Sequence, residues 1–205
     1  MTKGRLEAFS DGVIAIIITI MVLDLKAPAD THLAALLPIV PTLLSYILSF
    51  VYIGIYWNNH HHLLQATQHV NGTVLWANLH LLFWLSLVPF VTNWLGATHF
   101  ATLPVATYGA VLLMAGTAYF ILAHALIRYH GQESTIARAI GKDTKGTLSM
   151  AVYVLGILAA FIHPWLACGL YCFVAVIWLI PDRRIEDIIS AKSSSKPGIE
   201  DEGDR

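Results

Sequence analysis

The sequence predicts an all-α membrane protein that crosses the bilayer about six times. Of its 205 residues, 57% are hydrophobic and 12% are charged, and the mean hydropathy is +0.65. No Asp, Glu, Lys or Arg occurs between Thr31 and Ile127, and Gly146 to Pro181 also lacks them. A water-exposed surface of that length is not normally free of charge. Both stretches are therefore expected to be bundles of membrane helices.

A membrane helix needs about 20 apolar residues, and the apolar runs of this chain give six expected spans. They are Leu6–Leu25, Pro41–Leu64, Val74–Leu95, Val105–Arg128, Thr147–Ile162 and Pro164–Ile180. Pro38 and Pro41 suit the first turn of the second helix, and Pro89 is expected to kink the third. The last two spans are short and share only His163-Pro164 as a turn, which predicts a tight hairpin. An alternative count merges or shifts these two.

The distribution of Lys and Arg predicts the orientation. With the amino terminus inside, the outer segments hold only Lys26, and eleven basic residues lie inside: Lys3, Arg5, Arg128, Arg138, Lys142, Lys145, Arg183, Arg184, Lys192, Lys196 and Arg205. The excess of inner positive charge favours both termini in the cytoplasm of a multi-pass protein of the plasma or inner membrane. One inner loop, His60 to Gly72, carries histidines in place of Lys or Arg.

Two regions are expected: a transmembrane domain over residues 1–182 and a cytoplasmic tail over 183–205. The tail ends in S-S-S-K-P-G-I-E-D-E-G-D-R, a composition typical of disorder. Cys168 and Cys172 lie one turn apart in an apolar span, and the chain has no other cysteine. They are expected to be packing residues and not a metal or redox pair.

The start of the first span carries polar residues into the membrane. The segment R-L-E-A-F-S-D-G, Arg5 to Gly12, runs directly into V-I-A-I-I-I-T-I-M-V-L, Val13 to Leu23. A carboxylate at mid-bilayer costs roughly 2.5–3.5 kcal/mol on insertion scales. Asp11 is therefore expected to be a functional residue or a member of a polar network.

At about 100° per residue, one stripe about 100° wide runs along the first span. It consists of Ile16, Thr19, Ile20 and Leu23. Ser10 and Asp11 point away from it, so the stripe could face a shared axis while these two face neighbouring helices. On pattern alone, core packing of the stripe is the more ordinary interpretation.

The pattern R-x-x-x-F-S-D-G, made by Arg5, Phe9, Ser10, Asp11 and Gly12, resembles the signature of the endosomal/lysosomal-type transmembrane potassium channel family. The L-D-L that closes the first span is similar to the family too, and so is Y-W-N-N-H-H-H late in the second. A single motif copy with about six spans resembles the bacterial branch, since animal members carry two units in one chain.

The resemblance implies a homotetrameric cation channel, moderately selective for potassium over sodium, with the first helix of each subunit lining a central pore. The family's pore-facing positions, five, nine and twelve residues after the motif Asp, are Ile16, Ile20 and Leu23 here. Thr19 occupies a position that contributes to selectivity in some members. The carbonyl filter string T-V-G-Y-G is missing from the sequence, so we expect a hydrophobic constriction. K⁺ would be the permeant ion in a lipid bilayer, with no cofactor, no enzymatic activity and no nucleic-acid partner.

Ser10 and Asp11 are expected to bond to residues late in the second span, because a buried carboxylate needs donors. The candidates are Trp57, Asn58, Asn59, His60, His61 and His62. Trp57 and His61 are favoured because they lie four apart on one face. Arg5 lies about 240° round the helix from Asp11, so each is expected to find partners elsewhere. In the alternative, Asp11 sits in interfacial water.

Other functions compete with a potassium channel. A proton leak through the same pore is closely related to it. A secondary transporter would want ionisable residues at mid-membrane, which the charge-free centre lacks. A membrane enzyme or zinc or copper protein would use His60, His61, His62 and His69, but adjacent helical histidines point about 100° apart.

Overall fold

Every described element of the computed structural model is a helix; the structure describes residues 2–67, 69–131, 134, 137 and 143–179. In chain order the elements are α1 (Lys3–Leu23), the 3₁₀ helix η1 (Leu33–Ile39), α2 (Val40–Gln65), α3 (Gly72–Ser86), α4 (Val88–Ala97), α5 (Thr102–His130), α7 (Thr144–Ala160) and α8 (Pro164–Leu179). The six predicted spans are confirmed as helical, the third as the two helices α3 and α4 and the sixth as far as Leu179; Ile180, its predicted last residue, lies outside the described residues. The predicted tail, 183–205, lies outside the described residues.

Within the described residues, four helical runs are long and apolar enough to cross a membrane. They are Lys3–Leu23, Leu33–Gln65, Gly72–Ala97 and Thr102–His130. α7 and α8 are shorter, with 17 and 16 residues, and only residues 161–163 separate them. The predicted hairpin is confirmed, and the chain is a multi-pass membrane protein.

Proline explains where two helices differ from a single smooth span. Pro89 lies in the first turn of α4 and has no N–H to donate to the preceding helix, so α3 ends at Ser86 and α4 starts at Val88. The expected kink is present as an interruption of one residue, Leu87, whose backbone stays in the α-helical region. Pro41 occupies the first turn of α2 as predicted, whereas Pro38 belongs to η1, the tighter helix just before it.

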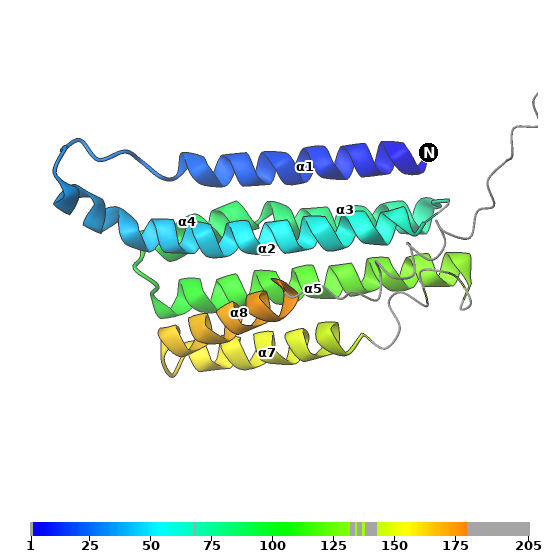
Figure 1. Cartoon of the computed structure of the whole chain (residues 1–205). Coiled ribbons are helices and arrows are strands. Elements are labelled where there is room, and N and C mark those ends of the chain that lie inside the picture. Colours follow the sequence, from blue (N-terminus) through cyan, green and yellow to red (C-terminus); the bar gives the residue numbers. More distant parts are fainter. Residues whose placement is uncertain (1, 68, 132–133, 135–136, 138–142, 180–205) are drawn as a thin grey trace, which may run out of the picture.

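The helices lie side by side with α1 along one edge and α7 along the opposite edge (Figure 1). α1 packs on α2, α3 and α4, whereas α5 packs on α3, α4, α7 and α8. One long face of α1 therefore stays uncovered within the protomer.

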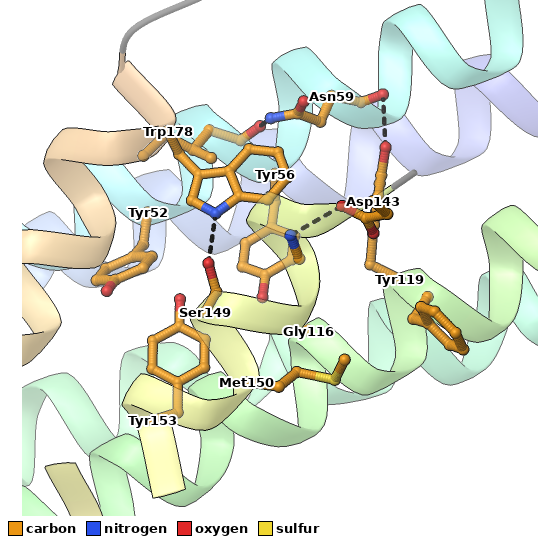
Figure 2. Close-up of a pocket in the computed structure, with 13 residues that line it drawn as sticks. Tyr52, Tyr56, Asn59, Gly116, Tyr119, Asp143, Ser149, Met150, Tyr153 and Trp178 are labelled. Atoms are coloured by element: carbon orange, nitrogen blue, oxygen red, sulfur yellow. Dashed lines mark hydrogen bonds between the residues drawn. The ribbon is translucent and has the colours of Figure 1, made fainter. Parts of the chain in front are cut away.

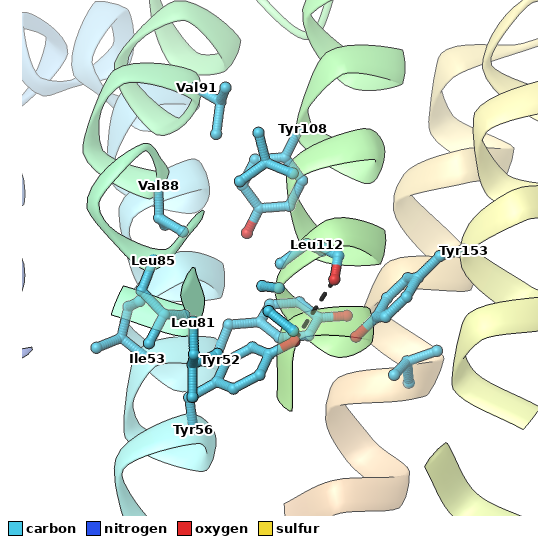
Figure 3. Close-up of a cluster of buried hydrophobic side chains, with 14 of the residues drawn as sticks. Tyr52, Ile53, Tyr56, Leu81, Leu85, Val88, Val91, Tyr108, Leu112 and Tyr153 are labelled. Carbon is cyan, nitrogen blue, oxygen red and sulfur yellow. Dashed lines mark hydrogen bonds between the residues drawn. The ribbon is translucent and has the colours of Figure 1, made fainter. Parts of the chain in front are cut away.

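Tyrosines and branched aliphatic residues from α2, α3, α4, α5, α7 and α8 fill the core (Figure 3). Tyr52, Tyr108 and Tyr171 are almost fully buried. Tyr52 donates to the carbonyl of Tyr171 at 2.6 Å, and Tyr108 pairs with Ser49 Oγ at 3.0 Å. A buried hydroxyl without a partner is costly in an apolar medium, so these bonds fix how the helices meet.

Candidate ion-conduction site

α1 has two contrasting faces. The face that packs inside the protomer carries Leu6, Ser10, Ile14, Ile17 and Met21. Their spacing of three and four residues is that of one helix face. The opposite face carries the predicted stripe, and its side chains are exposed: Ile16 by 58%, Ile20 by 47% and Leu23 by 76%. The stripe is therefore not used to pack this protomer's own core.

Thr19 is the one hydroxyl on the exposed stripe. Its Oγ1 donates to the backbone carbonyl of Ile16 at 2.9 Å. Because this bond uses the only hydroxyl proton, the oxygen lone pairs are what the side chain can offer to a neighbour. Such an oxygen can accept a hydrogen bond or contact a cation.

Asp11 is held by the second helix. Trp57 Nε1 donates to Asp11 Oδ1 at 3.0 Å. The indole ring stacks on His61, with the ring centroids 5.9 Å apart and the planes at 20°. His61 Nε2 in turn pairs with Gln65 Nε2 at 2.9 Å. The structure thus brings Asp11 and Trp57 into contact, and places His61 behind the tryptophan and not on the carboxylate.

Ser10 is fully buried in a chain of bonds that links three helices. Its hydroxyl donates to the carbonyl of Leu6 at 2.9 Å and accepts from Asn78 Nδ2 at 3.0 Å. Asn78 Oδ1 lies 2.7 Å from His60 Nε2. An amide oxygen only accepts, so His60 carries its proton on Nε2 in this arrangement.

Asn78 was not among the residues expected from the sequence. It lies in α3, whereas the candidates for Ser10 were all late in the second span. The only signal for it is a lone amide in the apolar run around Ala77 and Leu79. Such a residue usually marks a bond between helices.

Arg5 and Phe9, the other motif residues, face outward. Phe9 is 49% exposed, and Arg5 is also exposed. Within the described part of the chain, the Arg5 guanidinium has no hydrogen bond or ion pair. Arg5 and Asp11 are not paired, which agrees with their positions on the helix.

The other end of α1 is fixed by a second carboxylate. Asn93 Nδ2 in α4 donates to Asp24 Oδ1, just after the last turn of α1, at 2.6 Å. α1 is thus held by side-chain hydrogen bonds near both ends, and its exposed stripe lies between them.

The structure also tests the alternative of a metal-binding protein. Within the described ranges, no three His, Cys, Asp or Glu side chains are grouped so that they could hold a metal ion.

Comparison with known proteins identifies the family. The model of the endosomal/lysosomal potassium channel TMEM175 matches residues 5–89. A protein named as a potassium channel, from Chryseobacterium sp. (strain P1-3), is 60% identical over 186 residues, which are 91% of this chain and 97% of that protein. This chain belongs to the TMEM175 family.

A solved structure extends the similarity to the TMEM175 fold. The crystal structure of a lysosomal potassium-selective channel TMEM175 homolog from Chamaesiphon minutus superposes with a TM-score of 0.76 at 28% identity, covering 87% of this chain and 96% of that one. A TMEM175 protein of Danio rerio, named as an endosomal/lysosomal proton channel, is 39% identical over 84 residues, 33% of this chain and 16% of that protein. These three relatives carry the names of channels and not of enzymes.

Proposed function

We propose that this protein is a potassium channel in which four copies of α1 surround a central pore. The observation that carries the proposal is the division of α1 into a buried face and an exposed stripe of Ile16, Thr19, Ile20 and Leu23. The bacterial relatives named as potassium channels support the permeant ion. The channel lies in the plasma or inner membrane with both termini in the cytoplasm, as the basic residues favour.

Ile16 and Leu23 form the constriction in this proposal. Rings of branched apolar side chains give a narrow, poorly wetted passage in which an ion sheds part of its hydration. Potassium holds its water less tightly than sodium and is therefore favoured. Thr19 lies between the two rings, and its Oγ1 lone pairs replace some of the lost water, since its proton is already bound to Ile16.

The hydrogen bonds at both ends of α1 set its rotation. Asp11 bonds to α2, Ser10 bonds to α3 and Asp24 bonds to α4. Rotating α1 by about 100° about its own axis would shift the exposed stripe by one residue position. Such a rotation would break these hydrogen bonds. We assign Ser10, Asp11 and Trp57 to this anchoring role, with His61 stacked against Trp57. The motif residues Arg5 and Phe9 face outward, and we propose that they contact neighbouring subunits instead.

Potassium flux from liposomes that contain the purified protein tests the proposal, with sodium as the competing ion. Leu23→Ala widens the constriction, so we expect a larger conductance and a smaller preference for potassium. Thr19→Ala removes an oxygen from the passage, and we expect a lower potassium-to-sodium permeability ratio. Leu158→Ala is the matched control, because Leu158 is 61% exposed on α7 and far from α1 in the bundle.

Unchanged conductance and permeability ratios in both α1 variants would refute the assignment of the pore. The same changes in conductance and permeability ratio in Leu158→Ala would show that the variants act through the lipid-facing surface or through folding. Absence of potassium flux from the unaltered protein would refute the function itself.

A further inference from the structure

The geometry points to a second binding site in each protomer, one that takes an organic ammonium ion. A pocket that is open on one side lies between α2, α5, α7 and α8 (Figure 2). None of its 13 lining residues comes from α1. The site is therefore separate from the proposed pore and does not depend on it.

Six of the 13 lining residues are aromatic, and they come from all four helices. They are Tyr52 and Tyr56 of α2, Tyr119 and Phe120 of α5, Tyr153 of α7 and Trp178 of α8. Figure 2 shows the labelled members arranged around one space, with Asp143 beside it. Aromatic faces carry partial negative charge and attract alkylammonium groups, a combination used to recognise such ligands in proteins.

Three hydrogen-bond donors of this wall are already engaged. Tyr119 donates to the carbonyl of Asn59 at 3.3 Å and Tyr56 donates to that of Leu112 at 3.5 Å. Trp178 Nε1 donates to Ser149 Oγ at 2.8 Å. These three side chains therefore offer the space hydroxyl lone pairs and aromatic faces. The pocket therefore suits a ligand that donates and is positively charged.

Asp143 supplies the negative charge. Its Oδ1 accepts from Gly146 N at 2.8 Å, where it caps the start of α7. Within the described ranges, no Lys or Arg side chain forms an ion pair with this carboxylate. One carboxylate beside an aromatic wall matches a single ammonium group with an apolar tail. A primary arylalkylammonium has the right chemistry, and so does the ethanolamine headgroup of a lipid.

Binding of phenethylammonium to the purified protein, measured by titration calorimetry in phosphatidylglycerol nanodiscs, tests the assignment. The neutral analogue 2-phenylethanol is the matched ligand, and we expect it to bind at least about tenfold more weakly. Asp143→Asn removes the charge but keeps an oxygen that can cap Gly146. We expect this variant to lose at least about tenfold in affinity for the ammonium probe and little for the alcohol.

A second variant fills the space. A Cβ at Gly116 would lie 3.7 Å from the Tyr56 hydroxyl oxygen and 3.8 Å from Tyr153 Cε2, which is ordinary contact. Gly116→Ala should therefore fold, and Gly116→Leu should extend into the pocket and abolish binding. Leu23→Ala in the proposed pore should leave the affinity for phenethylammonium unchanged.

Equal affinity for the charged and neutral probes would overturn the site, and so would an Asp143→Asn variant that binds the ammonium as the unaltered protein does. Loss of binding in Leu23→Ala alone would place the probe in the pore and would also overturn it. Nanodiscs with added phosphatidylethanolamine identify the source of the ligand. Weaker binding of phenethylammonium in the presence of phosphatidylethanolamine supports a lipid headgroup as the natural occupant. Unchanged binding supports a free amine.

Discussion

At the scale of single residues, the polar side chains of α1 are positioned by partners on three different helices. Asp11 binds an indole in α2, Ser10 binds an amide in α3 and Asp24 binds an amide in α4. In an apolar surrounding a polar group without a partner costs more than a bond gains. Removing one partner of such a bond should therefore destabilise the protein more than removing both.

Trp57→Phe tests the bond to Asp11. Phenylalanine keeps an aromatic ring near His61 but removes the indole N–H of a partly exposed bond, so we expect a loss of about 0.5–1.5 kcal/mol, seen as a lower melting temperature of the solubilised protein. Trp76→Phe is the control, because Trp76 is 76% exposed and should be nearly neutral. Equal shifts in the two variants would contradict a specific role for the bond.

Ser10 and Asn78 form a pair suited to a double-mutant cycle. Ser10→Ala leaves Asn78 Nδ2 without its acceptor, and Asn78→Leu leaves His60 Nε2 without its acceptor and Ser10 without a donor. We expect each single change to cost about 1–3 kcal/mol. Because they share one bond, the double variant should cost less than their sum by about 0.5–3 kcal/mol, measured by thermal unfolding. Strict additivity would show that the two side chains do not interact.

Asp11 and Trp57 were predictable from the sequence because a carboxylate in an apolar run stands out and needs a donor at the same depth. Asn78 was not predictable. A helical wheel gives the direction in which Ser10 points, but it does not say which helix lies there. That information belongs to the packing of α1 on α3, which no local pattern encodes.

At the scale of helices, the spans were predictable because the bilayer sets a length that the apolar runs must match. The interruption between α3 and α4 was predictable as a kink, since Pro89 shows where a backbone hydrogen bond is missing. Which helices lie together was not predictable. α2 and α4 approach closely at Gly96, where a Cβ would lie 2.6 Å from the Thr42 Cα.

Gly96→Ala should force α2 and α4 apart, because the clash is with backbone that cannot rotate away. We expect a destabilisation of about 1–3 kcal/mol, read as a lower melting temperature. Gly54→Ala in α2 is the matched control, since nothing lies within 4 Å of its added Cβ. A melting temperature that falls equally in both variants would indicate a helix-wide effect and not the close approach.

At the scale of the whole molecule, the bundle leaves one face of α1 free while α7 and α8 lie toward the opposite edge (Figure 1). This asymmetry favours an assembly in which α1 is central and the hairpin is peripheral. From the sequence, a central position of α1 in a tetramer was expected only because of the family resemblance, since no pattern within one chain gives the number of subunits.

Disulfide cross-linking measures the arrangement of subunits. In a Cys172→Ser background, which removes the exposed thiol and keeps the buried Cys168, Leu23→Cys places one thiol per subunit near the proposed axis. We expect oxidation to give covalent dimers on a gel. Leu158→Cys on α7 should stay monomeric. Dimers from Leu158→Cys but not from Leu23→Cys would place the hairpin and not α1 at the centre.

The 17 residues of α7 span about 25 Å, while the neighbouring α5, with 29 residues, is about 43 Å long. The hydrocarbon layer of a typical bilayer is about 30 Å thick, so α7 is shorter than the layer that it has to cross. Acyl chains beside α7 must compress or tilt, at a cost that grows with each ångström. Each protomer is therefore expected to thin the bilayer on its outer flank and to be most stable among short-chain lipids.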